Sequence, residues 1–181
     1  PVKGCSRTDA GVHANGFVLS MRCPLTLPGQ VMARALNNPL PGDISVLDCA
    51  PAAEDFHPRY SCWGKRYRYQ IWNNESKNPF LEDLALQIRY PLQDAVAARA
   101  ARAFVGRRDF SALCAAGGGV EDKVRTIYDC RVERDGDLVT LWVTGDGFLY
   151  NMVRILTGTI LEVCAGKIGA DEIPGILDSR D

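Results

Sequence analysis

The feature that most constrains the fold is a stripe of apolar residues near the C-terminus. In the segment FLYNMVRILTGTILEVC, apolar side chains fall at helical spacing, at Leu149, Met152, Val153, Leu156, Ile160 and Val163. This period predicts one amphipathic helix that ends near Gly166. Because such a helix must bury its stripe against another element, the chain has to supply a complementary apolar face.

The segments before this helix supply that face as a sheet. Residues Thr126–Glu133 and Leu138–Thr144 read as the two strands of a hairpin, and Asp135-Gly136 between them tolerates the positive φ angles of a tight turn. A further strand is predicted for Trp63–Trp72, where Lys65, Tyr67, Tyr69 and Ile71 share one face and Arg66, Arg68, Gln70 and Trp72 share the other.

Other elements complete the predicted fold. An alanine-rich helix is expected from Pro91 to about Val105, with shorter helices at Gln30–Asn37 and Asp171–Leu177. Short strands are expected at Val18–Arg22, Ile44–Cys49 and Leu84–Tyr90. The pattern predicts an α+β fold in which helices pack on an antiparallel sheet.

Composition narrows the class of protein. Apolar residues make up 46% and charged residues 24% of the chain, as in ordinary globular proteins, and no apolar run reaches the length of a membrane helix. We therefore expect a cytoplasmic protein. The net charge of −1 argues against nonspecific coating of nucleic acid, although it permits a local basic face.

The cysteines argue against two kinds of site. There are seven of them, an odd number, with no C-x-x-C pair, and the two histidines, His13 and His57, lie far apart in the sequence. This pattern disfavours both a zinc site and a disulfide framework. Most of the cysteines are expected to be buried thiols.

The segment Arg7–Ala14 (RTDAGVHA) concentrates polar chemistry in a short loop. Its simplest interpretation is a turn in which Asp9 caps the backbone before Gly11. The alternative is a catalytic carboxylate, because Arg7 would keep Asp9 ionised and Gly11 lets backbone approach a ligand closely. From this segment alone, the turn is favoured.

A second segment, FHPRYSCWGKRYRY, combines basic and aromatic residues. It has Arg59, Lys65, Arg66 and Arg68, together with three tyrosines. The segment is either an edge strand with a solvated basic face or a surface for nucleic acid. In the second case the cations neutralise phosphates and the rings stack on unpaired bases.

A third candidate lies on the C-terminal helix. Tyr150 and Arg154 are four residues apart, which places them on one helical face beside the apolar stripe. Arg154 either extends to solvent or pairs with a carboxylate in a half-buried site. If that carboxylate is Asp9, the pair is bidentate.

Together these segments resemble the TruA family of tRNA pseudouridine synthases. GCSRTDAGVHA is similar to the catalytic-aspartate motif of the family, FHPRYSCWGKRYRY to its arginine and tyrosine strand, and GFLYNMVRILTG to its C-terminal catalytic helix. The linking segments LNNPLPGDISV, RDFSALCAAG and VRTIYDC are similar as well. The resemblance covers essentially the whole chain, with the motifs in the same order.

The resemblance implies a fold of two ferredoxin-like (RRM-like) halves with joined antiparallel sheets, helices on one side and an active site in the cleft between the halves. Residues 1–63 correspond to the remainder of an incomplete N-terminal half with the aspartate loop. Residues 64–181 correspond to the C-terminal half with the tyrosine strand and the arginine helix. The family acts on uridine in the tRNA anticodon arm as a homodimer, without metal or cofactor.

The resemblance also implies roles for particular residues. Asp9 corresponds to the nucleophile, Tyr67 to the ring that stacks on the target uracil and a candidate for moving a proton, and Arg154 to the partner of Asp9. The residues expected to support the site or contact RNA are Arg7, Arg59, Lys65, Arg66 and Arg68.

Two other functions remain open. The family usually begins before the position of Pro1 and continues past Asp181, so one alternative is an RNA-binding module that has lost catalysis through truncation. The other is a hydrolase that uses Asp9 to release uracil. Pseudouridine formation on a tRNA transcript separates the isomerase from the binding module, and free uracil would reveal the hydrolase.

Overall fold

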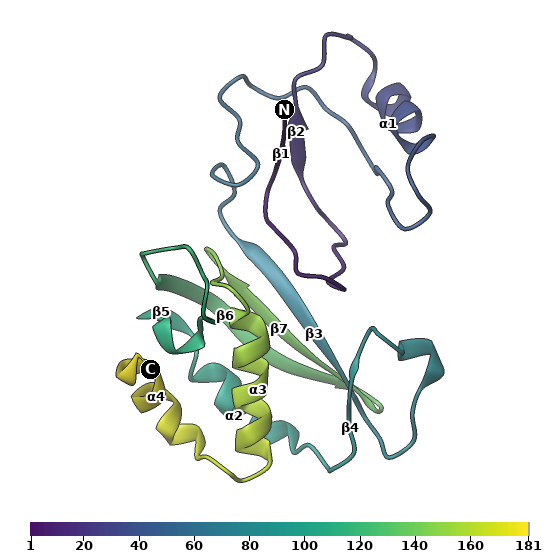
Figure 1. Ribbon diagram of the computed structural model, residues 1–181. Helices are drawn as coiled ribbons and strands as arrows, with labels where there is room; N and C mark the ends of the chain where they lie inside the picture. The colour runs from purple at the N-terminus through teal and green to yellow at the C-terminus, as the bar shows by residue number, and fades with distance from the viewer. Residues whose placement is uncertain (181) are drawn as a thin grey trace. The chain divides into compact units, whose positions relative to one another are not determined.

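The computed structural model describes residues 1–180, which divide into two compact units, Pro1–Trp63 and the part that begins at Gly64 (Figure 1). Each unit is described by itself. In the first, β1 (Val2–Gly4) and β2 (Leu19–Met21) form an antiparallel two-stranded sheet. Helix α1 (Gly29–Asn37) follows, which confirms the helix predicted there.

One strand predicted in the first unit is wrong. Residues 44–49 form no strand. The side chain of Asn37 takes the place of a neighbouring strand, because its amide donates to the Val46 carbonyl at 2.9 Å and accepts from the Val46 N–H at 2.7 Å. The polar backbone groups of Val46 are therefore satisfied without a sheet.

The second unit contains a five-stranded sheet with helices. Its strands are β3 (Lys65–Asn73), β4 (Leu86–Ile88), β5 (Gly106–Asp109), β6 (Val124–Asp135) and β7 (Leu138–Gly145). The spatial order is β4-β3-β7-β6-β5. The helices are α2 (Asp94–Arg102), α3 (Met152–Cys164) and α4 (Ile173–Ser179), with single 3₁₀ turns at Pro79–Leu81, Ser111–Leu113 and Ala170–Glu172.

The order of elements confirms an α+β fold. Strand β3 leads through α2 to the β6–β7 hairpin and then to α3, and β3 pairs with β7 rather than β6. A first strand placed beside the third is characteristic of a ferredoxin-like half. Because β4 runs parallel to β3, the sheet is mixed rather than antiparallel throughout. The joining of sheets between the two halves stays a prediction.

Helices α2 and α3 pack against one face of this sheet and bury its apolar side chains (Figure 1). Ile71 on β3 and Leu141 and Val143 on β7 point to this face. From α3, Met152 and Leu156 are fully buried, as the apolar stripe predicts. None of the helices in residues 1–180 is long and apolar enough to cross a membrane.

The β6–β7 hairpin is confirmed, although its turn is shifted by one residue. Asp135 pairs with Leu138, so Gly136 and Asp137 form the turn, and Gly136 has a φ of +56° that favours glycine. A bulge between Ile127 and Asp129 leaves Tyr128 as an extra residue in β6. Such a bulge redirects the side chain of the extra residue.

The cysteines differ from the prediction. All seven are free, but only Cys130 is buried, Cys23 is exposed, and the others are half-buried. Burial raises the pKa of the Cys130 thiol to about 12, so this thiol stays protonated at neutral pH. Four of the half-buried cysteines, Cys5, Cys49, Cys62 and Cys114, lie outside helices and strands, where a sequence pattern does not determine burial, and Cys164 is the last residue of α3.

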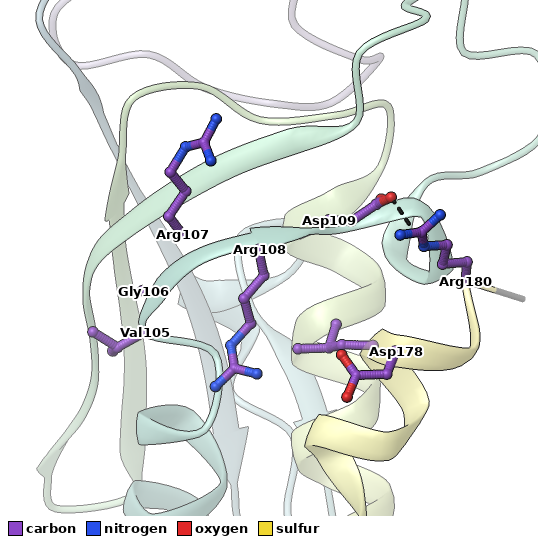
Figure 2. A pocket seen from close by; sticks show the side chains of 8 residues that line it. Val105, Gly106, Arg107, Arg108, Asp109, Asp178 and Arg180 are labelled. Carbon is purple, nitrogen blue, oxygen red and sulfur yellow. Dashed lines mark ion pairs between the residues drawn. The ribbon is translucent and has the colours of Figure 1, made fainter.

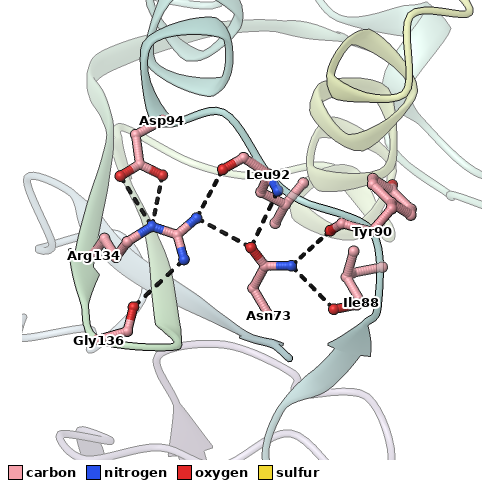
Figure 3. Close-up of polar contacts among 7 residues, drawn as sticks. All are labelled: Asn73, Ile88, Tyr90, Leu92, Asp94, Arg134 and Gly136. Carbon is pink, nitrogen blue, oxygen red and sulfur yellow. Dashed lines mark hydrogen bonds and ion pairs between the residues drawn. The ribbon is translucent and has the colours of Figure 1, made fainter. Parts of the chain in front are cut away.

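A polar cluster joins the ends of β3, the hairpin and α2 (Figure 3). The Asn73 amide donates to the carbonyls of Ile88 and Tyr90, and its oxygen accepts from the Leu92 N–H at 3.1 Å. The Arg134 guanidinium donates to Asp94 at 2.8 and 3.0 Å and to the carbonyl of Leu92 at 2.9 Å. These bonds fix the start of α2 to the sheet.

We predict that Arg134→Met lowers the free energy of unfolding by about 1–2 kcal/mol, because it leaves several acceptors without their charged donor. The Arg134 side chain is 26% exposed, so water replaces only part of these bonds. Arg99→Met is the control, because the side chains of Arg99 and its partner Asp171 are 64% and 83% exposed. Urea unfolding measures both variants, and an equal effect of the two would contradict this role of Arg134.

Candidate active site

The loop with Asp9 connects β1 to β2. The Cys5 N–H donates to the Val18 carbonyl at 2.9 Å, which continues the pairing of β1 with β2 into the base of the loop. At its tip, the Val12 N–H donates to the Asp9 carbonyl at 3.1 Å, and Gly11 has a φ of +75°. Asp9 therefore occupies the first position of a tight turn whose third position favours glycine.

This geometry is compatible with both interpretations of the segment, a backbone turn and a catalytic carboxylate. The Asp9 backbone closes the turn, as the simpler interpretation requires, while the side chains of Arg7 and Asp9 are exposed. Because the turn fixes the backbone at Asp9, it also fixes the direction of the Cα–Cβ bond of this residue. The loop can thus present a carboxylate on a defined scaffold.

The β3 strand separates the predicted residues onto two faces, as its alternation predicts. Tyr67 is half-buried and opposes Val143, and its ring meets that of Phe148 edge to face, with 4.9 Å between centroids and 75° between planes. Lys65 lies on the same face of the strand. Arg66 and Arg68 are exposed on the other face, where the Arg66 Nε donates to the Thr144 hydroxyl at 3.2 Å.

The start of α3 corrects one prediction. Asn151 has a φ of +57° and precedes the first helical residue, Met152. Tyr150 is therefore outside the helix, and the four-residue spacing does not place it on one helical face with Arg154. Asparagine tolerates the left-handed backbone that Asn151 adopts before this helix. Arg154 is exposed in the first turn of α3.

Two neighbours of Tyr67 and α3 were not predicted. Phe148 lies in the connection from β7 to α3, where it also packs against the core. Arg125 lies against Gly147, because a Cβ atom added there would be 3.3 Å from the Arg125 Nε. Phe148 is part of the GFLYNMVR motif, which was the signal for it. No sequence spacing predicts that Arg125 lies near the segment between β7 and α3.

The triple-glycine segment Gly117–Gly119 is also close to the start of α3. The Ala115 N–H donates to the Tyr150 carbonyl at 3.1 Å, and a Cβ atom on Gly118 would lie 3.4 Å from the Tyr150 Cβ. No Lys-Ser/Thr pair follows these glycines, so the segment lacks the motif of a phosphate-binding loop. In the structure, this segment borders the connection that holds Phe148 and Tyr150.

Of the predicted site residues, Tyr67 contacts the connection into α3 through Phe148. Tyr67, Phe148 and the connection into α3, which leads to Arg154, belong to the second unit. Arg7, Asp9 and Arg59 belong to the first unit. The pairing of Asp9 with Arg154 therefore stays a prediction.

A pocket in the second unit is lined by none of the residues predicted for the active site. Figure 2 shows this pocket of about 620 Å³, which residues 105–109 line together with Leu177, Asp178 and Arg180. Arg180 pairs with Asp109 at 3.3 Å. Hydrogen bonds from the Ser111 hydroxyl and N–H lower the pKa of Asp109, and they fix the turn after β5.

Comparison with known proteins first gives the class. A family model described as tRNA pseudouridine synthase matches residues 100–181, which indicates an RNA-modifying enzyme. The tRNA pseudouridine synthase A of Halalkalibacterium halodurans is 45% identical over 179 residues, 99% of this chain and 68% of the relative. That of Acetivibrio thermocellus is 45% identical over 98% of this chain and 72% of its own, and that of Bacillus subtilis is 40% identical over 100% and 73%. The chain belongs to the tRNA pseudouridine synthase family.

Proposed function

We propose that this protein isomerises uridine to pseudouridine in the anticodon arm of tRNA, with Asp9 as the nucleophile. The observation that carries the proposal is the placement of Tyr67, whose ring is held against Phe148 in the connection that leads to Arg154. The identity of 45% to a named tRNA pseudouridine synthase, over 99% of the chain, supports the same reaction.

The reaction exchanges one bond to ribose for another. The bond between N1 of uracil and C1′ breaks, the bond between C5 and C1′ forms, the proton leaves C5, and N1 ends with a proton. Substrate and product are isomers, so no oxidant, reductant or group donor is consumed. The protein has to hold the detached base, allow it to turn, and keep water from C1′.

Asp9 can act in either of two ways. Its carboxylate can attack C1′ as the glycosidic bond breaks and positive charge develops on the sugar, much as in glycoside hydrolysis. It can instead attack the uracil ring. Arg154 is proposed to pair with Asp9, which would keep the carboxylate ionised and oriented.

Tyr67 is suited to hold the uracil while it turns. An aromatic ring binds the face of a base without a directional bond, so the base can rotate in its own plane. The contact with Phe148 limits the motion of the Tyr67 ring. Its phenol is also a candidate for moving the C5 proton.

The basic residues are proposed to bind the RNA backbone. Arg7 and Arg59 in the first unit and Arg66 and Arg68 on β3 are exposed, so their guanidinium groups can reach phosphates. Lys65 is half-buried on the face of Tyr67. We further propose that the protein works as a homodimer on the anticodon stem-loop.

The test is incubation of the protein with a tRNA transcript, followed by nucleoside analysis. We expect pseudouridine in the anticodon arm and no free uracil. RNA binding without pseudouridine would instead support a binding module, and free uracil would support a hydrolase. Transcripts with cytidine at single anticodon-arm uridines identify the modified position.

For Tyr67, we predict that Tyr67→Phe binds tRNA within about twofold of the wild type, because the stacking ring is kept. Tyr67→Leu should weaken binding about 5- to 150-fold. Fluorescence anisotropy with labelled tRNA measures both affinities. Loss of binding in Tyr67→Phe would contradict the stacking role, while a much lower kcat with unchanged affinity would assign the proton transfer to the phenol.

A further inference from the structure

The segment from His57 to Trp63, here called the 57–63 turn, presents aromatic rings outward. Tyr60 and Trp63 are 79% and 78% exposed, whereas the other two tryptophans, Trp72 and Trp142, are half-buried. Burial of such a ring is a large source of binding energy. The catalytic roles proposed above leave both rings unused.

Hydrogen bonds among residues 57–61 fix the first part of the 57–63 turn. The His57 carbonyl accepts from the N–H groups of Tyr60 at 3.1 Å and Ser61 at 2.8 Å, and the His57 N–H donates to the Ser61 hydroxyl at 3.1 Å. The Arg59 N–H donates to the His57 Nδ1 at 3.2 Å. The backbone that carries Tyr60 therefore has little conformational entropy to lose on binding.

The Tyr60 ring is also supported from within this turn. It lies 4.4 Å from the His57 ring between centroids, with 36° between the planes. This contact restricts the orientation of the phenol ring while most of its surface stays exposed. Tyr60 is thus a preorganised ring at the surface of the first unit.

The charge around the turn selects the class of partner. Arg59 is exposed within it, and the sequence has no acidic residue between Asp55 and Glu75, although the chain has 22 acidic residues in all. Exposed rings in a basic segment without carboxylates fit a polyanion with stacking groups, which is single-stranded nucleic acid. A purely apolar partner would gain nothing from the cations.

We propose that Tyr60 and Trp63 form a stacking platform for unpaired bases of the RNA substrate, other than the base that is modified. The proposal rests on the proposed function only in taking RNA as the substrate. Arg59 contributes a phosphate contact beside the platform. The platform adds affinity for single-stranded segments and takes no part in the bond exchange.

The test measures affinity of the full protein for two probes, a labelled tRNA transcript and a labelled single-stranded oligoribonucleotide. We expect Trp63→Ala and Tyr60→Ala each to weaken both complexes about 5- to 150-fold. Trp63→Phe and Tyr60→Phe should stay within about threefold of the wild type. Because neither ring meets a phosphate, the slope of log K against log salt should be unchanged in the alanine variants, whereas Arg59→Ala should reduce it by about one.

Two exposed apolar residues serve as controls. Leu47 is 81% exposed in the first unit and Phe80 is 89% exposed in the second. Leu47→Ala and Phe80→Ala should leave both affinities unchanged. Alanine variants of Tyr60 and Trp63 that bind RNA as the wild type does would overturn the platform, and so would variants that change only the oligomeric state in sedimentation.

The outcomes also separate the platform from the proposed function. If the wild type makes pseudouridine and the Tyr60 and Trp63 alanine variants keep their RNA affinity, the platform fails and the function stands. If the wild type makes no pseudouridine while these variants lose RNA affinity, the function fails and the platform stands.

Discussion

Asp9→Asn is expected to abolish pseudouridine formation, with a fall in kcat of at least about a thousandfold, while tRNA affinity changes less than about threefold. The asparagine side chain has the same size as that of Asp9. The turn is kept as well, because it is closed by the backbone carbonyl of residue 9, which accepts from the Val12 N–H. The substitution removes the negative charge that a nucleophile or a cation-stabilising group requires. Affinity is retained because phosphate contacts dominate tRNA binding.

The measurement combines single-turnover kinetics on a tRNA transcript with anisotropy for affinity. Asp43→Asn is the matched control, since Asp43 is an exposed carboxylate in the same unit, and its kcat should equal that of the wild type. Turnover by Asp9→Asn at more than a tenth of the wild-type rate would remove Asp9 from the chemistry. A large loss of affinity would instead make it a binding residue.

Sequence periodicity predicted the elements that have a strongly apolar side. The stripe at Met152 and Leu156 and the alternation in β3 correspond to helix α3 and to the two faces of the sheet. Strand β5 was missed because its sequence, GRRD, has no apolar alternation, although its residues pair with Val124–Ile127 of β6. Residues 44–49 have the apolar alternation of a strand but form none. The Asn37 amide satisfies the backbone groups of Val46 in place of a neighbouring strand.

The candidate site was predicted through motifs rather than periodicity. Asp9, Tyr67 and Arg154 are conspicuous in three segments that resemble one family, and their roles stay proposals. Spacing failed at Tyr150, because the left-handed Asn151 lies between Tyr150 and the first residue of the helix, Met152. Arg125 reaches the same connection only through the tertiary fold, since it is 22 residues before Gly147 in the sequence.

The proposed pair of Asp9 and Arg154 makes a second strong prediction. Arg154→Met should lower kcat at least about a hundredfold, because Asp9 loses the guanidinium that orients it. Arg154→Lys should recover only part of the loss, since an ammonium does not reproduce a bidentate contact. Arg99→Met is the control, because Arg99 is an exposed arginine on α2 whose partner is Asp171.

The double variant decides whether the two residues act together. If Arg154 acts through Asp9, then Asp9→Asn combined with Arg154→Met should be no slower than Asp9→Asn alone, because residues that act as a unit are not additive. If each acts separately, the two losses should multiply, and the residual rate should fall a further hundredfold. Single-turnover assays at saturating enzyme measure this difference directly, and a multiplicative result would assign Arg154 to the RNA rather than to the carboxylate.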